Sequence, residues 1–170
     1  MSVLRYGSSV LLTISVVGCT AVVEQELIDN EMWEFVRAED DPFEDFRESD
    51  STCNPLGVMV EAGVLEVQTD VCDFVTVTQA AKVKARKGHL LDILAYHSAL
   101  FSDPESTGYI AIQIGGSIVW EQSVSIPGDA DVYANTMAVF PDINVGTPIY
   151  FHVHNHGANS WKLAHIRLIP

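Results

Sequence analysis

The sequence predicts an antiparallel β-sandwich, and three observations support this fold class. Runs of alternating apolar and polar residues recur from residue 56 onward, as at residues 64–69 and 74–79. Turn-forming residues separate about eight such runs at intervals of roughly 8–12 residues. Two cysteines in this part of the chain, Cys53 and Cys72, can form a disulfide. Short strands of this kind bury one face each, so they fold as two packed sheets.

The individual strands follow from the pattern and from the turns. Residues 109–114 and 117–122 alternate on either side of Gly115-Gly116, a typical two-residue hairpin connection. Residues 90–100 fit a helix as well as a buried strand, and we expect a strand because the neighbouring segments are β. Three further strands are expected at residues 132–140, 148–154 and 160–169, the last two joined by a turn at residues 155–159.

The first residues have the organisation of a secretory signal. Arg5 places one positive charge near the start, and residues 9–17 are apolar and uncharged. This run is shorter than the roughly 20 apolar residues that span a bilayer. We therefore predict that residues 1–18 are a signal peptide.

The signal ends in Val16-Val17-Gly18-Cys19, which resembles the lipobox of bacterial lipoproteins. The resemblance implies cleavage before Cys19, a thioether lipid on its sulfur and acylation of the new N-terminus. Val16 departs from the leucine that is commonest at its position. Thr20 after the cysteine implies the outer membrane or the cell surface, with the periplasmic face as an option. An ordinary signal with a chance cysteine, or an uncleaved N-terminal helix, is the alternative.

The cysteine count agrees with lipidation. Of three cysteines, Cys53 and Cys72 remain as a pair once Cys19 carries lipid, and export favours oxidation. Such a bridge would stabilise the fold by about 3 kcal/mol. Two free buried thiols are the alternative.

Charge divides the mature chain into a predicted acidic tether, residues 19–52, and a predicted β-sandwich head, residues 53–170. The tether holds twelve of the 23 acidic residues against Arg37 and Arg47, a net charge of −10. The head holds eleven acids against six bases, a net charge of −5.

Within the tether, apolar residues recur at helical spacing around residues 24–38, which predicts a short amphipathic helix. Residues 39–51 are acidic and turn-rich, which is typical of a solvated, disordered linker. The segment would serve as a spacer, or as a protein-docking segment through Trp33, Phe43 and Phe46.

The net charge of −14 and the absence of a basic stripe argue against nucleic acid as a partner. One basic cluster is present, at Lys82, Lys84, Arg86 and Lys87. It would form the solvated side of an edge strand, or it would meet anionic lipid headgroups or the acidic tether.

Residues 150–168 combine an apolar strand, an Asn-containing turn, a tryptophan and a second alternating strand. This stretch resembles the last two strands of galactose-binding-like jelly-roll domains. The resemblance implies a jelly-roll head from a fold group rich in carbohydrate-binding modules, although a fold alone does not give a function.

Aromatic residues with polar neighbours are candidates for glycan binding. Aromatic rings match the apolar C–H faces of sugars, and amides can bind hydroxyls. The candidates are Trp120, Tyr133, Asn155, Asn159 and Trp161. Trp120 and Trp161 also fit a core role, because they lie within alternating strands.

Histidines at 152, 154 and 156 alternate and would share one face of a strand. Residues i and i+2 are about 6.6 Å apart, so His152 and His154 can share a metal, whereas i and i+4, about 13 Å apart, cannot. His97 is the candidate third ligand for zinc or copper. A structural or pH-responsive role is the alternative.

Other chemistry has weaker support. Residues 70–73 and 128–131 place carboxylates in loops, but neither matches an EF-hand calcium loop. The familiar enzyme signatures are absent, so we expect no catalytic activity.

The sequence thus predicts a lipid-anchored extracytoplasmic binding module, with a glycan or polysaccharide as the favoured ligand. A structural subunit of a cell-envelope or surface assembly is the second hypothesis, and a histidine-based metal-binding protein is the third.

Overall fold

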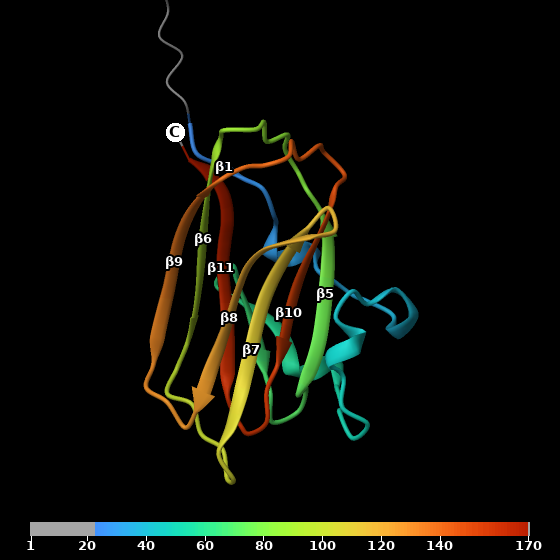
Figure 1. The fold of residues 1–170 in the computed structure, drawn as a ribbon, viewed down its shortest axis with the longest axis vertical. Coiled ribbons are helices and arrows are strands. Elements are labelled where there is room, and N and C mark those ends of the chain that lie inside the picture. The colour runs from blue at the N-terminus through green and yellow to red at the C-terminus, as the bar shows by residue number, and fades with distance from the viewer. Residues whose placement is uncertain (1–22, 170) are drawn as a thin grey trace, which may run out of the picture.

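A computed structural model describes residues 23–169, which form two antiparallel β-sheets packed face to face (Figure 1). The predicted antiparallel sandwich of jelly-roll type is confirmed. The predicted signal peptide, residues 1–18, and the predicted lipidation site Cys19 lie outside the described residues. No helix among residues 23–169 is both long enough and apolar enough to cross a bilayer.

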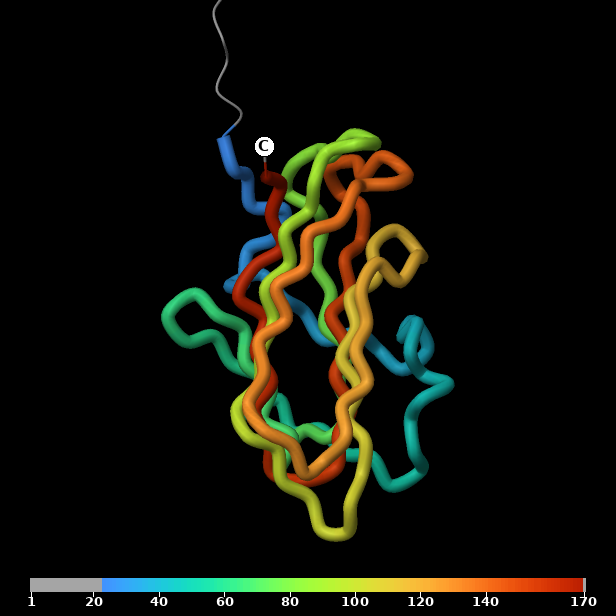
Figure 2. The backbone as a smooth tube through the Cα atoms, turned by 60° about the vertical axis from the view of Figure 1, so that its left-hand side comes forward, coloured from blue at the N-terminus to red at the C-terminus, as the bar shows by residue number. Residues whose placement is uncertain are grey.

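The first sheet, sheet A, has the order β3 (Val58–Glu61), β4 (Val64–Gln68), β11 (Ser160–Ile169), β6 (Leu90–His97) and β9 (Asp131–Ala138), with β1 (Gln25–Glu26) also paired to β11. The second sheet, sheet B, has the order β2 (Glu34–Phe35), β5 (Phe74–Ala80), β10 (Pro148–His154), β7 (Ser106–Ile114) and β8 (Ser117–Ile126). The connections include short 3₁₀ turns at η1 (Asn30–Met32), η2 (Ala38–Asp40), η3 (Glu44–Phe46) and η4 (Pro55–Gly57). Figure 2 separates the two layers.

The core lies between the sheets and follows the alternation of the sequence. In β6, Leu91, Ile93 and Ala95 are buried while the residues between them are partly exposed, which confirms the strand expected there. Phe151 of β10 and Trp161 of β11 are fully buried in the same core. Alternation therefore places one face of each strand in the apolar interior.

Two turns need glycine. Gly115 and Gly116 join β7 to β8 with φ of 56° and 85°, which confirms the predicted hairpin, since two positive φ angles are what a type I′ turn requires. Gly157 lies in the β10–β11 turn, where a Cβ atom would stand 2.2 Å from the carbonyl oxygen of Phe101. This turn and the 98–105 loop therefore pack backbone against backbone.

The α-helix predicted near residues 24–38 is not present in the described residues. That segment instead forms β1, η1 and β2, with Leu27 and Ile28 buried. Its backbone groups hydrogen-bond to sheet edges, because β1 pairs with β11 and β2 pairs with β5. Pairing to the sandwich replaces the internal hydrogen bonds that a helix would make.

The acidic stretch 39–51 is mostly exposed, as expected of a solvated segment, but part of it is attached to the sandwich. Residues 38–48, here called the strap, lie along the outer face of sheet B (Figure 1). Phe43 is 1% exposed and stacks on His152, with 4.4 Å between ring centroids. Residues 25–46 therefore belong to the same fold as the rest of the sandwich.

The two ends of the sandwich carry different loops. The end where β1 lies beside the C-terminal end of β11 carries loops 81–89 and 139–147, and it is called the terminal end (Figures 1 and 2). The opposite end, called the far end, carries loops 69–73, 98–105 and 155–159.

The predicted disulfide between Cys53 and Cys72 is present, and Cys72 is fully buried. The bond fastens residue 53 to the β4–β5 turn, 19 positions along the chain.

Reduction of this bond should lower the free energy of unfolding by about 3 kcal/mol, because the cross-link restricts the unfolded chain. Urea denaturation with and without dithiothreitol measures the difference. The double variant Cys53→Ala/Cys72→Ala should be insensitive to the reductant. An unchanged unfolding midpoint for the reduced native chain would contradict the expectation.

Candidate functional site

A polar row of side chains and an adjoining hollow, together called the recess, lie on sheet A toward the far end. Its centre is one row of outward-facing side chains on three neighbouring strands, Glu66 of β4, Lys162 of β11 and Tyr96 of β6. Residues opposite each other in register share a face of a sheet, so these three side chains lie side by side.

The recess continues toward the far end as a hollow of about 430 Å³. Gln68 and Ser160 are the next opposed pair along β4 and β11. The lining residues are Gln68, Asp70, Ser98, Ala99, Phe101, Ala158, Asn159 and Ser160. Every lining residue is polar or small except Phe101.

Glu66 is the most buried charged group of the recess, with 9% of its side chain exposed. Lys162 Nζ lies 3.1 Å from Glu66 Oε2, and Ser160 Oγ donates to Glu66 Oε1 at 2.6 Å. Burial alone would raise the pKa of Glu66, but the hydrogen bonds from Ser160 and Lys162 outweigh burial and lower it. The same contact raises the pKa of Lys162. Both groups are therefore charged at neutral pH, and the pair has no net charge.

Phe101 supplies an exposed aromatic face at the rim, with 66% of the residue accessible. The amide side chain of Asn159 holds both the N–H and the carbonyl group of Phe101. Phe101 N donates to Asn159 Oδ1 at 2.6 Å, and Asn159 Nδ2 donates to the Phe101 carbonyl at 3.1 Å. The ring is thus exposed on a rigid loop. Tyr96 is the second aromatic residue of the recess, and its ring centroid lies 5.9 Å from Lys162 Nζ.

The predicted ligand residues Asn155, Asn159 and Trp161 support this recess rather than form its open surface. Asn155 is 2% exposed and donates to Thr69 Oγ1 at 2.6 Å. Asn159 lines the hollow but is 5% exposed and is engaged with Phe101. Trp161 is fully buried in the core. The 155–159 turn contributes Ala158 and Asn159 to the lining, whereas Trp161 lies beyond this turn in β11.

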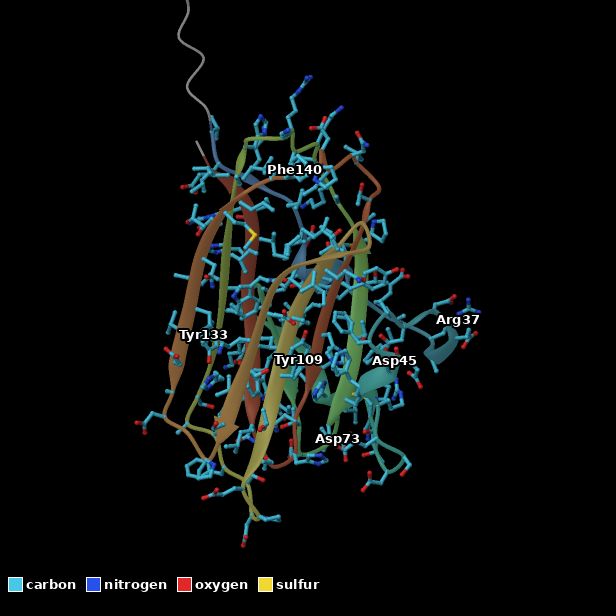
Figure 3. All side chains as sticks on the ribbon, in the orientation of Figure 1. Arg37, Asp45, Asp73, Tyr109, Tyr133 and Phe140 are labelled. Atoms are coloured by element: carbon cyan, nitrogen blue, oxygen red, sulfur yellow. A yellow bond between two sulfur atoms is a disulfide. The ribbon has the colours of Figure 1, made fainter. Side chains whose placement is uncertain are left out.

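Trp120 and Tyr133 lie elsewhere. A chain of aromatic contacts runs from Trp161 to His97 (4.8 Å), then to Tyr133 (5.6 Å), then to Trp120 (5.6 Å). These contacts cross the interior to β8 and β9, which are edge strands of sheet B and sheet A. Figure 3 shows Tyr133 on β9. Trp120 is 8% exposed, and Tyr133 is half-buried, so its pKa is raised by burial. The two residues pack together but do not join the recess.

The three candidate metal ligands do not converge. His97 faces the interior from sheet A, where Nδ1 contacts the Ser98 carbonyl at 2.8 Å and Nε2 contacts the Tyr133 hydroxyl at 2.9 Å. His152 and His154 lie on the outer face of sheet B under the strap. Among residues 23–169, no three histidine, cysteine or carboxylate side chains are placed to share a metal ion. The zinc or copper site proposed from spacing is therefore not assembled by these residues.

His152 and His154 instead belong to a chain of hydrogen bonds that holds the strap. Thr76 Oγ1 donates to Asp41 Oδ1 at 2.8 Å, so its single proton is used and it accepts from His152 Nδ1, also at 2.8 Å. His152 Nε2 then accepts from His154 Nδ1 at 2.8 Å. This order fixes one tautomer for each neutral ring.

Burial keeps His152 neutral. Desolvation, followed by the charges of His154 and Arg47, lowers its pKa well below the ordinary value. Burial also lowers the pKa of His154. The chain of hydrogen bonds needs His152 neutral, because Nε2 of a protonated His152 could not accept from His154 Nδ1.

Sequence reasoning missed Glu66, Lys162, Tyr96 and Phe101. The first three are outward-facing positions on alternating strands, which look like ordinary solvated residues. Only the strand order, in which β11 lies between β4 and β6, brings them together.

No protein-family model matches the chain, and no curated protein matches its sequence. Solved structures with a similar arrangement of strands include one described as "CBM4 structure and function", at 14% identity over 84% of this chain and 88% of that chain, with a TM-score of 0.49. The xylan-binding module CBM15 is similar at 11% identity over 86% and 95%, with a TM-score of 0.47. CBM35 from Paenibacillus barcinonensis is similar at 12% identity over 88% and 99%, with a TM-score of 0.39. At these sequence identities and TM-scores, the similarity gives no information about a ligand of this chain.

Acidification should destabilise the protein through His152. Its folded-state pKa lies below the unfolded value of about 6.5, so the unfolded chain binds the proton first. The contribution of His152 is complete above about pH 6.5 and is lost as the pH falls toward the folded-state pKa. Between pH 7 and pH 5.5 the free energy of unfolding should fall by about 1 kcal/mol for this residue.

Urea denaturation of the native chain, His152→Gln and His156→Gln at several pH values measures this effect. His156 is exposed and serves as the matched control. The slope against pH should diminish in His152→Gln and persist in His156→Gln. Equal slopes in all three proteins would remove His152 as the cause.

Proposed function

We propose that this protein is a binding module that takes a neutral glycan in the recess of sheet A and is held at a membrane by lipid on Cys19. One observation carries the glycan proposal. An exposed aromatic ring, Phe101, stands on a rigid loop beside a row of polar side chains that are already oriented. Sugars offer both an apolar C–H face and hydroxyl groups, so they match this combination.

The polar row favours a neutral ligand. Glu66 and Lys162 cancel each other's charge, and each retains hydrogen-bonding capacity because a carboxylate has four lone-pair sites and an ammonium has three protons. Asp70 is the one further charge in the lining. A strongly anionic polysaccharide would meet this carboxylate without a second cation to compensate for it.

A binding role fits the recess better than catalysis. Glycoside hydrolysis usually needs two carboxyl groups, one of them kept protonated by a raised pKa. The pKa of Glu66 is lowered, because Ser160 and Lys162 stabilise the carboxylate against the effect of burial. The recess therefore offers a fixed acceptor of hydrogen bonds rather than a proton donor.

Phe101→Ala should weaken glycan binding about tenfold or more, because the ring supplies the stacking surface. Isothermal titration against soluble xylan, β-glucan and galactomannan, with pectin as an anionic comparison, measures the change. Phe140→Ala is the matched control, since Phe140 is equally exposed at the terminal end. Absence of binding to every neutral polymer, or equal binding by both variants, would overturn the assignment.

The anchor has its own test. Mass spectrometry of the protein from the membrane fraction of a bacterial host should find a mature chain that begins at Cys19 and carries the mass of acyl groups. Cys19→Ser should abolish both the modification and the cleavage. An unmodified Cys19 in the membrane-bound native chain would refute lipidation and leave the glycan proposal standing.

A further inference from the structure

The terminal end of the sandwich is a rigid platform made of two loops. Loops 81–89 and 139–147 are joined by backbone hydrogen bonds, among them a reciprocal pair between Ala85 and Ile143 at 2.8 and 2.9 Å. Gly88 N donates to the Val139 carbonyl at 3.0 Å. The backbone of both loops is therefore held in place, and the side chains that point away from the core project from fixed positions.

This platform is basic, although the chain as a whole has a net charge of −14. Its two loops carry four lysine or arginine residues and one acid, Asp142. Lys82 is paired with Asp29 at 3.1 Å. Lys84, Arg86 and Lys87 are exposed, and none of them forms an ion pair with a carboxylate of residues 23–169. These three positive charges are thus free to meet an external anion.

The same platform exposes apolar side chains. Phe140 is 72% exposed and Val145 is 65% exposed, and Figure 3 shows Phe140 at this end of the molecule. Lys87 Nζ lies 4.5 Å from the Phe140 ring centroid, so a cation and an aromatic ring project together. Basic and aromatic side chains side by side are typical of segments that rest at a membrane interface.

The chain enters the sandwich at this end. β1 and the C-terminal end of β11 lie next to the platform (Figure 1), and β1 pairs Gln25 with Leu168. Four residue steps separate Val23 from Cys19, a span of at most about 15 Å when fully extended. Lipid on Cys19 would hold the platform close to the headgroups, within reach of charges that act over roughly 10 Å.

We propose that Lys84, Arg86, Lys87, Phe140 and Val145 form a docking surface for anionic phospholipid headgroups. The orientation of this surface rests on the lipid anchor proposed above. The basic side chains contact the headgroups, and Phe140 enters the interface between headgroups and acyl chains. The recess of sheet A then opens toward the other end of the molecule, away from the bilayer.

Hydrogen exchange on the full chain reconstituted into vesicles tests the proposal. Two compositions are compared, phosphatidylcholine alone and phosphatidylcholine mixed with phosphatidylglycerol. Amides of loops 81–89 and 139–147 should exchange several-fold more slowly on the anionic vesicles. Each basic side chain should change the docked population about fivefold, so Lys84→Glu/Arg86→Glu/Lys87→Glu should abolish the protection, as should high salt.

Phe140→Ala should reduce the protection, and Phe101→Ala should leave it unchanged. Loop 69–73 at the far end, which carries none of these substitutions, is the internal reference for exchange in every sample. Equal exchange of the platform on both vesicle types, or protection that survives the triple charge reversal, would overturn the proposal. Titration of the same preparations with glycan separates this outcome from failure of the recess, and the mass of Cys19 separates it from failure of the anchor.

Discussion

The stacking of Phe43 on His152, together with the hydrogen bonds that run from Asp41 through Thr76, fixes the N-terminal part of the chain on sheet B. Burial of these groups ties an acidic segment, which would otherwise be solvated, to the outer face of the sandwich. Upstream of this segment, β1 pairs Gln25 with Leu168, which places the first described residues beside the end of β11. The strap and β1 together hold residues 25–46 on the sandwich.

A buried polar chain stabilises a structure only when every member has a partner, because an unpaired group in a low-dielectric interior is costly. Thr76, His152 and His154 meet this condition through one consistent direction of donation. Phe43 stacks on His152 and Phe74 contacts its ring edge-on, and His152 is inaccessible to solvent. The alternation of histidines that suggested metal binding is thus explained by the strap, which needs polar but neutral side chains beneath it.

The sequence was sufficient for the strands and for the Gly115-Gly116 hairpin, because both depend on local alternation and local turn chemistry. It was insufficient for residues 25–46, where apolar spacing fits a helix equally well and long-range pairing with β11 and β5 decides the outcome. For the site, the sequence located the 155–159 turn but not the function of its members. Asn159 lies beneath the rim because its amide is used by Phe101, 58 positions away. No local pattern encodes that partner.

The antiparallel topology itself separates the two proposed surfaces. The β4–β5, β6–β7 and β10–β11 connections all lie at the far end and contribute Asp70, Phe101 and Asn159 to the recess. The β5–β6 and β9–β10 connections lie at the terminal end and supply the basic and apolar platform. Strand β11 runs from Ser160 in the recess to Ile169 beside the platform, ten residues that span about 30 Å. A sandwich that lies on lipid through one set of loops therefore carries the other set at a distance where a polymeric glycan is accessible, and no hinge is needed to reach it.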